Sequence, residues 1–555
     1  MRQPKSNSLR LLIKILRQKI NESKTKEGSE QQNLPGEEKI FNRRKFLVES
    51  SKGVLAITIA SSLPLLHSCD GADKSSEKKS TTKSAEKNIQ IAIIGGGIAG
   101  LNCAYHLQKA GIKATIYEAS QRMGGRILTH YNDSTGLGIF PEFGGDFIDS
   151  SHEDMLGLAK EFNLETIDLK KEMIDQKLQN EVYYFNNKNI PEKEIIKEFH
   201  KISGKIGADI ASLGDDYNTE AAILLDNTPL SKYIDSLPCA KWMKQLFHAS
   251  FTAEYGLDCS EQSTLNFLDM INPDTKEGFE VFGDSDERYR IKGGNSKIIE
   301  SITAKLERNQ IKRGFRLTTI EDAENNQYQL SFENEKPVIS DYVVMAIPFT
   351  ILRNVKINLK DMLPEKRKCI DELGFGNNTK LVLVYDGSPW RDGPNPSTGR
   401  VCQENITNGW DGGYTKTENN SHGAYVCYFG GKYSEDLSKS SFMNPRTPPT
   451  HKWRTELPKE KVVQLSKELD RSFKGSHKKF VNKHVYVNWI DYPYTKGSYS
   501  CFKTGQWNTL AAYTRAPIGK VLFAGEHCST DFQGFMNGGA ETGRRAAEDL
   551  KVLLG

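Results

Sequence analysis

A glycine-rich turn between an apolar strand and a helix places the strongest constraint on how this chain folds. The pattern predicts the strand at 89–94, the turn at 95–100 and the helix at 101–110. A second strand at 114–117 ends at Glu118. Strand, turn, helix and second strand in this order form the βαβ unit that binds dinucleotides. The alternative is an ordinary glycine turn in an α/β protein.

Each glycine of the turn has a separate physical reason. Gly95 makes the tight turn, Gly97 lets the backbone approach a pyrophosphate, and Gly100 lets the helix pack closely on the strand. Free N–H groups at the start of the helix, around Ile98 and Ala99, hold phosphate oxygens. A carboxylate at the end of the second strand, Glu118, is placed to bind the ribose hydroxyls of adenosine.

Length and composition exclude several classes of function. The chain has 555 residues, enough for two or three domains, and its 75 basic and 71 acidic residues nearly balance. No charge excess favours nucleic acid as a partner. The nine cysteines contain no Cys-x-x-Cys pair, so neither a metal site nor a disulfide framework is predicted. No apolar run reaches the about 18–20 residues that span a bilayer.

The N-terminal region resembles an export signal rather than part of the fold. Arg43 and Arg44 precede an apolar run at 54–66, which is typical of a twin-arginine (Tat) signal. The run ends close to Cys69, in a setting similar to a bacterial lipoprotein cleavage box. Residues 70–87 are rich in Ser, Lys and Glu and are predicted to be a flexible tether. We therefore expect an exported protein of the periplasm or cell envelope, with the membrane contacted only through a lipid on Cys69. The alternative is a basic tail on a cytoplasmic enzyme.

Periodicity predicts the elements of the remaining chain. Helices are expected at 154–164, 192–213, 220–270, 296–307 and 537–550. Strands are expected at 317–320, 328–332, 341–348, 380–385, 425–429 and 521–526. The prolines and polar residues of 433–458 predict a long surface loop.

The fold class predicted from these patterns is α/β, with two domains and a Rossmann-like nucleotide domain. Buried strands at 89–94, 341–347 and 521–524 each carry glycine or proline at the C-terminal end, where ligands bind. The nucleotide domain is therefore assembled from separate segments, and a substrate domain of mixed sheet and helices is inserted between them. The expected division is 1–69 and 70–87 for signal and tether, 88–170, 291–350 and 515–555 for the nucleotide domain, and 171–290 and 351–514 for the substrate domain.

Five spaced motifs point to one family. Residues 118–126 read Glu-Ala-Ser-Gln-Arg-Met-Gly-Gly-Arg, 142–145 read Glu-Phe-Gly-Gly, and 293–294 are a glycine pair. Ala-Ile-Pro follows at 346–348, and Phe-Ala-Gly-Glu and Gly-Phe-Met-Asn-Gly-Gly-Ala lie within 523–540. In this order the motifs resemble the FAD-dependent amine oxidase superfamily of monoamine, polyamine and L-amino-acid oxidases. The motifs are specific for the superfamily and much less so for the substrate.

The resemblance implies that the cofactor is FAD and names the residues that hold it. The implied cofactor-binding residues are Gly95, Gly97, Ile98, Ala99, Gly100, Glu118, Ala119, Gly125, Arg126, Gly145, Asp146, Phe147, Leu317, Gly525, Glu526 and Met536. Ser498 stands where covalent members of the family carry a cysteine, and Cys501 is out of register. The resemblance therefore implies noncovalent FAD.

The same resemblance implies three residues at the reacting end. Lys380 matches a lysine that binds a water beside flavin N5 and assists reoxidation by oxygen. Tyr499 and Phe535 match two aromatic faces that hold the substrate nitrogen. Read singly, these residues are a surface lysine and two core aromatics.

The implied activity is oxidative deamination of a small amine. A hydride equivalent passes to flavin N5, the imine hydrolyses to an aldehyde or ketone and ammonia, and oxygen is reduced to hydrogen peroxide. The position that aligns with the carboxylate-binding arginine of L-amino-acid oxidases lies near Phe147 and is apolar, although Arg288 or Arg290 can supply such a clamp. The alternatives left open are an L-amino-acid or polyamine oxidase, a flavin-dependent desaturase or isomerase, and a tethered flavin-binding protein. The oligomeric state is not predicted.

Overall fold

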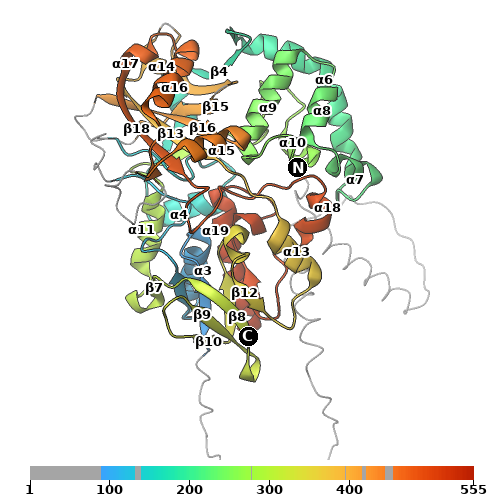
Figure 1. The fold of residues 1–555 in the computed structure, drawn as a ribbon, viewed down its shortest axis with the longest axis vertical. Helices are drawn as coiled ribbons and strands as arrows, with labels where there is room; N and C mark the ends of the chain where they lie inside the picture. The colour runs from blue at the N-terminus through green and yellow to red at the C-terminus, as the bar shows by residue number, and fades with distance from the viewer. Residues whose placement is uncertain are drawn as a thin grey trace, which may run out of the picture.

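A computed structural model of the chain describes residues 89–131, 139–276, 278–393, 395–404, 406–414, 421–443 and 454–554. The predicted twin-arginine signal, Cys69 and the tether at 70–87 lie outside these residues. The described chain forms two parts, with sheets in both (Figure 1). One part carries β1, β7 to β12 and the C-terminal helix, and the other carries β13 to β18 and the helices α6 to α10.

A five-stranded parallel sheet forms the centre of the first part, in the order β19-β11-β1-β2-β7. Its strands are β19 (Val521–Phe523), β11 (Tyr342–Met345), β1 (Ile91–Ile94), β2 (Thr115–Glu118) and β7 (Ile311–Arg313). All four residues of β1 are buried, since helices or strands cover both faces. The three buried strands at 89–94, 341–347 and 521–524 are therefore neighbours, although they are far apart in sequence.

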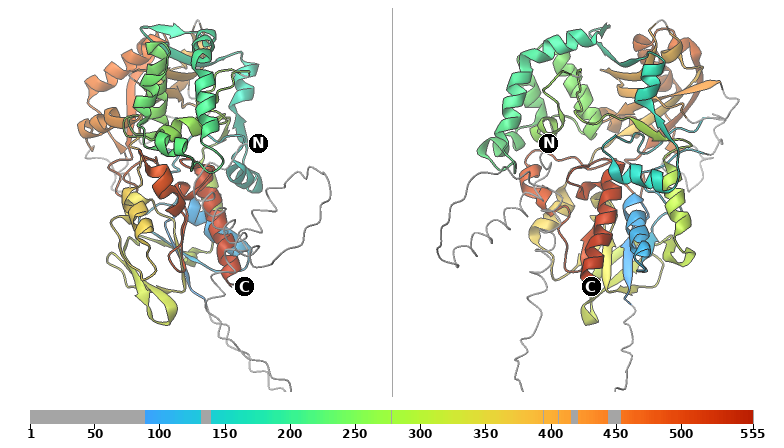
Figure 2. Two further views of the ribbon diagram at one scale, coloured as in Figure 1. Left: turned by 90° about the vertical axis from the view of Figure 1, so that its right-hand side faces the viewer. Right: turned by 180° about the vertical axis from the view of Figure 1, so that it is seen from behind.

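Two helices pack tightly together on this sheet. α3 (Ile98–Lys109) follows the glycine turn, and α19 (Met536–Leu554) lies beside it (Figure 2, right). A Cβ on Gly543 would lie 2.2 Å from the carbonyl oxygen of Ala99, so only glycine permits this spacing. Asn102 Nδ2 donates to the carbonyl of Ala540 at 2.7 Å across the same interface.

A four-stranded sheet extends this part, in the order β10-β9-β8-β12. Its strands are β8 (Leu317–Ala323), β9 (Gln327–Phe332), β10 (Val338–Ser340) and β12 (Lys356–Asn358). β12 falls in the range 351–514 that the sequence assigns to the substrate domain, yet it pairs with β8. The division at residue 350 was therefore wrong for β12, because after β11 and the short helix α12 (Phe349–Leu352) the chain adds one more strand to the first part before it enters the second.

An eight-stranded sheet forms the centre of the second part, in the order β17-β18-β13-β16-β15-β14-β4-β5. β13 (Thr379–Asp386) lies between β16 (His422–Phe429) and β18 (Phe480–Asn488) and is buried from Thr379 to Tyr385. The remaining strands of the sheet are β4 (Gln179–Phe185), β5 (Lys188–Ile190), β14 (Ser397–Gln403), β15 (Thr407–Asp411) and β17 (Arg454–Thr455). A two-stranded ribbon joins β3 (Thr166–Asp168) to β6 (Tyr289–Ile291).

Helices cover one side of the eight-stranded sheet (Figures 1 and 2). The longest is α6 (Glu192–Ser212), whose apolar face buries Ile195, Phe199, Ile202 and Ile206 at helical spacing. The other helices of this group are α7 (Glu220–Asp226), α8 (Leu230–Ser236), α9 (Lys241–Tyr255) and α10 (Thr264–Met270). The remaining helices are α4 (Glu153–Glu161), α5 (Leu169–Asp175), α11 (Ser296–Lys305), α12 (Phe349–Leu352), α13 (Pro364–Glu372), α14 (Pro389–Asp392), α15 (Gly431–Ser440), α16 (Lys459–Ser472), α17 (Ser476–Lys479) and α18 (Gln506–Leu510).

The loop predicted at 433–458 was wrong in its first part. α15 occupies 431–440, and Leu437 is buried in it while Tyr433 packs on the same core one turn earlier. This i, i+4 apolar pair outweighs the polar composition, since one buried stripe suffices to dock a short helix. Residues 444–453 lie outside the described chain. Among the helices of the described residues, none is long and apolar enough to cross a membrane.

Candidate active site

One cavity runs from the glycine turn to β13 and is lined by both parts of the molecule. Most residues predicted to bind cofactor or substrate line it: Gly95, Gly97, Ile98, Ala99, Glu118, Gly125, Arg126, Gly145, Asp146, Phe147, Lys380, Tyr499, Gly525, Glu526, Phe535 and Met536. Three predicted residues, Gly100, Ala119 and Leu317, are not among the lining residues. Leu317 is buried in β8 within the hydrophobic core, so its role at an adenine stays a prediction.

The glycine turn has the geometry that a bound pyrophosphate requires. Gly95 has a φ of +111°, and a Cβ there would lie 2.6 Å from the carbonyl oxygen of Ala346. A Cβ on Gly100 would lie 2.0 Å from the carbonyl oxygen of Gly95, which explains a packing role away from the cavity. By contrast, a Cβ on Gly97 would meet only the Cα of Gly125, at 3.9 Å, so this glycine faces open space in the cavity. The cradle therefore fits a dinucleotide phosphate at the start of α3.

Glu118 ends β2 at the wall of this cradle. Its Oε2 accepts the N–H of Gly96 at 2.7 Å, and its Oε1 accepts the N–H of Ser120 at 2.7 Å. Each oxygen accepts one N–H here, and a carboxylate oxygen can accept a second hydrogen bond. The arrangement therefore fits the predicted contact with ribose hydroxyls.

Arg126 and Glu526 form a partly buried ion pair that joins two segments of the first part, 400 positions apart in sequence. Arg126 Nη1 lies 2.9 Å from Glu526 Oε1 and donates to the carbonyl of Ser498 at 2.7 Å. Glu526 Oε2 also accepts the Ser500 hydroxyl at 2.7 Å and the N–H of Gly534 at 2.9 Å. Burial raises the pKa of Glu526, but Arg126 and these donors outweigh it, so its pKa lies below the usual range. Glu526 is thus a fixed anion that orients the arginine.

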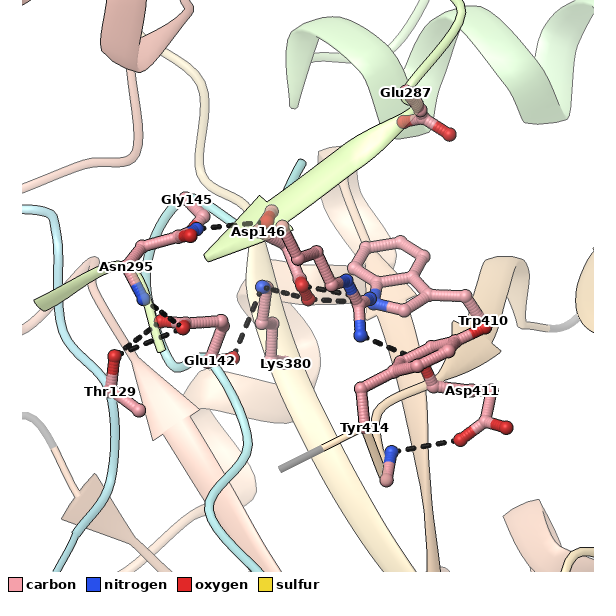
Figure 3. A network of polar contacts seen from close by, with 12 residues as sticks. Thr129, Glu142, Gly145, Asp146, Glu287, Asn295, Lys380, Trp410, Asp411 and Tyr414 are labelled. Atoms are coloured by element: carbon pink, nitrogen blue, oxygen red, sulfur yellow. Dashed lines mark hydrogen bonds and ion pairs between the residues drawn. The ribbon is translucent and has the colours of Figure 1, made fainter. Parts of the chain in front are cut away.

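Lys380 is buried at the reacting end, with 4% of its surface exposed. Its Nζ donates to the carbonyl of Gly144 at 2.7 Å. It also donates to the carbonyl of Glu142 at 3.3 Å and to Asp146 Oδ2 at 3.3 Å (Figure 3). The alternative interpretation, a solvated lysine on the surface, is therefore wrong because the Lys380 side chain is buried. β13 brings this about because its central place in the sheet buries every side chain from Thr379 to Tyr385.

Asp146 connects Lys380 to a second cation. Arg290 Nη2 lies 2.8 Å from Asp146 Oδ1, an ion pair whose atoms are not aligned for a hydrogen bond. Trp410 Nε1 donates to Asp146 Oδ2 at 2.7 Å. The Arg290 guanidinium lies 4.5 Å from the ring centres of both Phe147 and Tyr414. Sequence reasoning assigned Asp146 to the flavin wall and did not foresee this pairing.

Glu142 is a second carboxylate beside the lysine. Its oxygens accept the Thr129 hydroxyl at 3.0 Å, and Oε1 accepts the N–H of Asn295 at 2.7 Å. Burial and the nearby Asp146 raise the pKa of Glu142. Burial lowers the pKa of Lys380, while Asp146 and Glu142 act in the opposite direction.

The two aromatic residues predicted for the reacting end both line the cavity. Tyr499 donates to the carbonyl of Glu254, and its hydroxyl lies 2.9 Å from that of Tyr428. Phe535 packs edge-on against His152, with ring centres 5.1 Å apart. Tyr428 and Trp410 also line the cavity and were missed. The signal for Tyr428 was present, since β16 was predicted and the strand register pairs Tyr428 with Lys380.

Ser498 and Cys501 bear on how a flavin is held. Ser498 lines the cavity, and its hydroxyl donates to Asn378 Oδ1 at 2.6 Å. Cys501 is fully buried and is not a lining residue. In the described part of the chain no cysteine lines the cavity, and no cluster of His, Cys, Asp and Glu forms a metal site.

Arg288 and Arg290, the two arginines considered as ligands for a substrate carboxylate, are both paired with carboxylates of the protein. Arg288 binds Asp168 through two nitrogens, at 3.0 and 2.7 Å. Arg290 is paired with Asp146, and neither arginine lines the cavity. Neither side chain is therefore available to bind a substrate carboxylate in this arrangement.

Comparisons with known proteins agree with this geometry. Residues 98–551 match the family model described as flavin containing amine oxidoreductase. The flavin-containing amine oxidase A of Sus scrofa is 24% identical over 493 residues, covering 86% of this chain and 88% of that protein. The B enzyme of Homo sapiens is 24% identical over 478 residues, covering 84% and 86%.

Solved structures share the fold. Cyclohexylamine oxidase from Brevibacterium oxydans IH-35A superposes with a TM-score of 0.69 at 19% identity, covering 84% of this chain and 99% of that one. A putrescine oxidase bound to putrescine superposes with a TM-score of 0.68 at 18% identity, with the same coverage. The predicted α/β fold with a Rossmann-like FAD domain and a second domain is therefore confirmed.

Proposed function

Because the chain belongs to the flavin containing amine oxidoreductase family, and is thus an FAD-dependent enzyme acting on amines, we propose that its cavity deaminates a small amine with oxygen as electron acceptor. The overall reaction converts R₂CH–NH₂, O₂ and H₂O into R₂C=O, NH₃ and H₂O₂. Bound FAD supplies the acceptor for two electrons and a hydrogen from the carbon beside the nitrogen, and returns the electrons to oxygen.

The observation that carries this proposal is a buried lysine in the same cavity as a dinucleotide cradle. Gly97 leaves room for phosphates, Glu118 would accept hydrogen bonds from ribose hydroxyls, and Arg126 lines the same cavity. Lys380 lies at the opposite part of the cavity, beside the Glu142–Gly145 turn. The lining therefore fits an extended FAD with its reacting ring toward Lys380.

Residues of the chain then account for the work at the reacting end. Tyr499 and Phe535 offer aromatic faces that align a neutral amine and exclude water. Lys380 places a positive charge where negative charge develops as electrons move to oxygen. An amine is favoured over an α-amino acid as the substrate, because Arg288 and Arg290 are paired with carboxylates of the chain.

The test is a peroxide and ammonia assay on the purified FAD-loaded protein, with panels of amines, polyamines and α-amino acids. We expect both products from amines, in equal amounts. Lys380→Met should keep FAD but slow oxidation by roughly tenfold or more. Lys366→Met is the matched control, since Lys366 is equally buried but does not line the cavity. Unchanged turnover in Lys380→Met would remove that lysine from the mechanism.

We also propose that the protein is exported by the Tat route and anchored in the cell envelope by a lipid on Cys69. The support is the order of Arg43-Arg44, the apolar run at 54–66 and Cys69. The route carries folded proteins, which suits an enzyme that must first enclose its cofactor. We expect the mature protein in the membrane fraction and its release by Cys69→Ala, while Cys239→Ala leaves it there. A wild-type protein that stays in the soluble fraction contradicts the anchor.

A further inference from the structure

We propose that Asp146 is a positioning residue: its carboxylate holds the Lys380 ammonium at the reacting end and sets the pH range over which that ammonium stays charged. This inference rests on the proposed role of Lys380 in the oxidation. It adds a second residue to the reacting end that acts through the lysine rather than on the substrate.

The position of the ammonium is determined by three oxygens. Two are backbone carbonyls of the turn at 142–145, and the third is Asp146 Oδ2 at 3.3 Å. An ammonium has three N–H donors, so these acceptors use its whole capacity. Asp146 is the one charged group among them, and it therefore supplies most of the attraction that keeps a buried cation in place.

Asp146 cannot easily turn away from the lysine, because both of its oxygens are engaged. Oδ1 faces Arg290 at 2.8 Å, and Oδ2 accepts Trp410 Nε1 at 2.7 Å. Arg290 is itself held, since it lies between the rings of Phe147 and Tyr414 and donates to the carbonyl of Asp411 at 3.2 Å. The carboxylate is thus oriented from three sides before any ligand binds.

Two carboxylates and one other cation surround the Lys380 ammonium, so the removal of any one of these charges should change the pKa of the lysine. The groups that face it are the carboxylates of Asp146 and Glu142, the Arg290 guanidinium and the rings of Trp410 and Tyr428. Glu287 acts at longer range on Asp146 and Arg290. Burial and Arg290 lower the pKa of Lys380, whereas the two carboxylates raise it.

Two substitutions should therefore move the titration of Lys380 in opposite directions. Asp146→Asn leaves two buried cations facing a single carboxylate, so the ammonium loses its proton at lower pH. Arg290→Gln removes the repelling cation and keeps Asp146, so the proton is retained to higher pH. We expect the alkaline limb of the oxidation rate to shift down by about one pH unit or more in the first variant and up in the second.

The decisive readout is the visible absorption spectrum of the bound flavin, titrated against pH in the FAD-loaded protein. A charge that appears or disappears beside the ring shifts its spectrum, whether or not any amine turns over. We expect a spectral step that is absent in Lys380→Met, moves to lower pH in Asp146→Asn and moves to higher pH in Arg290→Gln. Asp146→Glu should return the step toward its wild-type position. Asp341→Asn is the control for loss of a buried carboxylate, because Asp341 binds Gln90 and Gln327 at the start of β11.

Three results overturn the inference. The first is a spectral step whose pH midpoint is the same in wild type, Asp146→Asn and Arg290→Gln. The second is a step that moves as far in Asp341→Asn as in Asp146→Asn. The third is a pH-dependent spectral change in Asp146→Asn that is still present when Lys380→Met is added to that variant. Should Asp146→Asn fail to hold FAD, the Arg290→Gln and Asp146→Glu titrations still decide. A wild-type protein that oxidises no amine but shows the step refutes the proposed function and leaves the role of Asp146 standing.

Discussion

Lys366 offers a quantitative test of how this fold tolerates a buried charge. It lies on α13 with 1% of its surface exposed, and its Nζ donates to the carbonyls of Tyr513 and Thr514 at 2.9 Å each. The Nζ also lies 3.4 Å from the centre of the Phe523 ring. Burial lowers the pKa of Lys366 from 10.5 to about 8. The nearby thiols of Cys528 and Cys369 act in the opposite direction, but burial outweighs them.

The pKa shift gives both the sign and the size of the expected effect. The folded state releases the proton at lower pH than the unfolded chain, so between pH 8 and 10.5 the unfolded chain binds more protons and stability rises with pH. The difference between the two pKa values corresponds to about 3 kcal/mol in all. Roughly 2 to 3 kcal/mol of that is expressed between pH 7 and 10, because the unfolded lysine is still mostly protonated at pH 10.

Lys366→Met removes this linkage. We expect the free energy of unfolding of the variant, relative to wild type, to be most favourable at pH 7 and to fall by roughly 2 to 3 kcal/mol by pH 10. Urea unfolding followed by far-UV circular dichroism at several pH values measures it, and all other titrating groups cancel in the difference. A stability difference that stays constant from pH 7 to pH 10 would refute the reasoning.

Three further predictions address the cavity. Gly97→Val should fold but bind FAD with an affinity lower by about tenfold or more, because the valine side chain enters the phosphate cradle. Gly157→Ala is the control for the loss of a glycine, since a Cβ at Gly157 meets nothing within 4 Å. Titration with FAD, followed by flavin fluorescence, measures both affinities. Phe535→Ala should lower kcat/KM for amines by roughly tenfold in steady-state assays. Phe532→Ala is the control and should not lower it, because the Phe532 ring also contacts His152 but does not line the cavity. Equal losses in the two variants would show that the effect of Phe535→Ala is structural. Acid precipitation should release all the flavin, since Ser498 cannot form a thioether, and yellow protein in the pellet would contradict noncovalent binding.

Local patterns predicted much of the fold, because the strongest of them act over a few residues. The turn at 95–100 and the apolar run of β11 depend on glycine geometry and burial that neighbouring residues already encode. α15 was missed because its amphipathic stripe is only one turn long. The Asp146–Arg290 pair was missed for a different reason, since its partners lie far apart in sequence and meet only when Ile148 pairs with Tyr289 of β6. Ion pairs between residues that are distant in sequence can therefore be identified only from the three-dimensional structure.

The strand order of the five-stranded sheet also constrains when the protein can acquire its cofactor. β1 is made early, yet its neighbour β11 begins at Tyr342, and the next strand, β19, begins at Val521. The helix that closes the cradle against α3 is α19, which begins later still, at Met536. The contact between Asn102 of α3 and Ala540 of α19 spans 438 positions of the sequence, so the phosphate-binding turn is synthesised long before its cover. Firm retention of FAD therefore has to wait for the segment from Met536 onward.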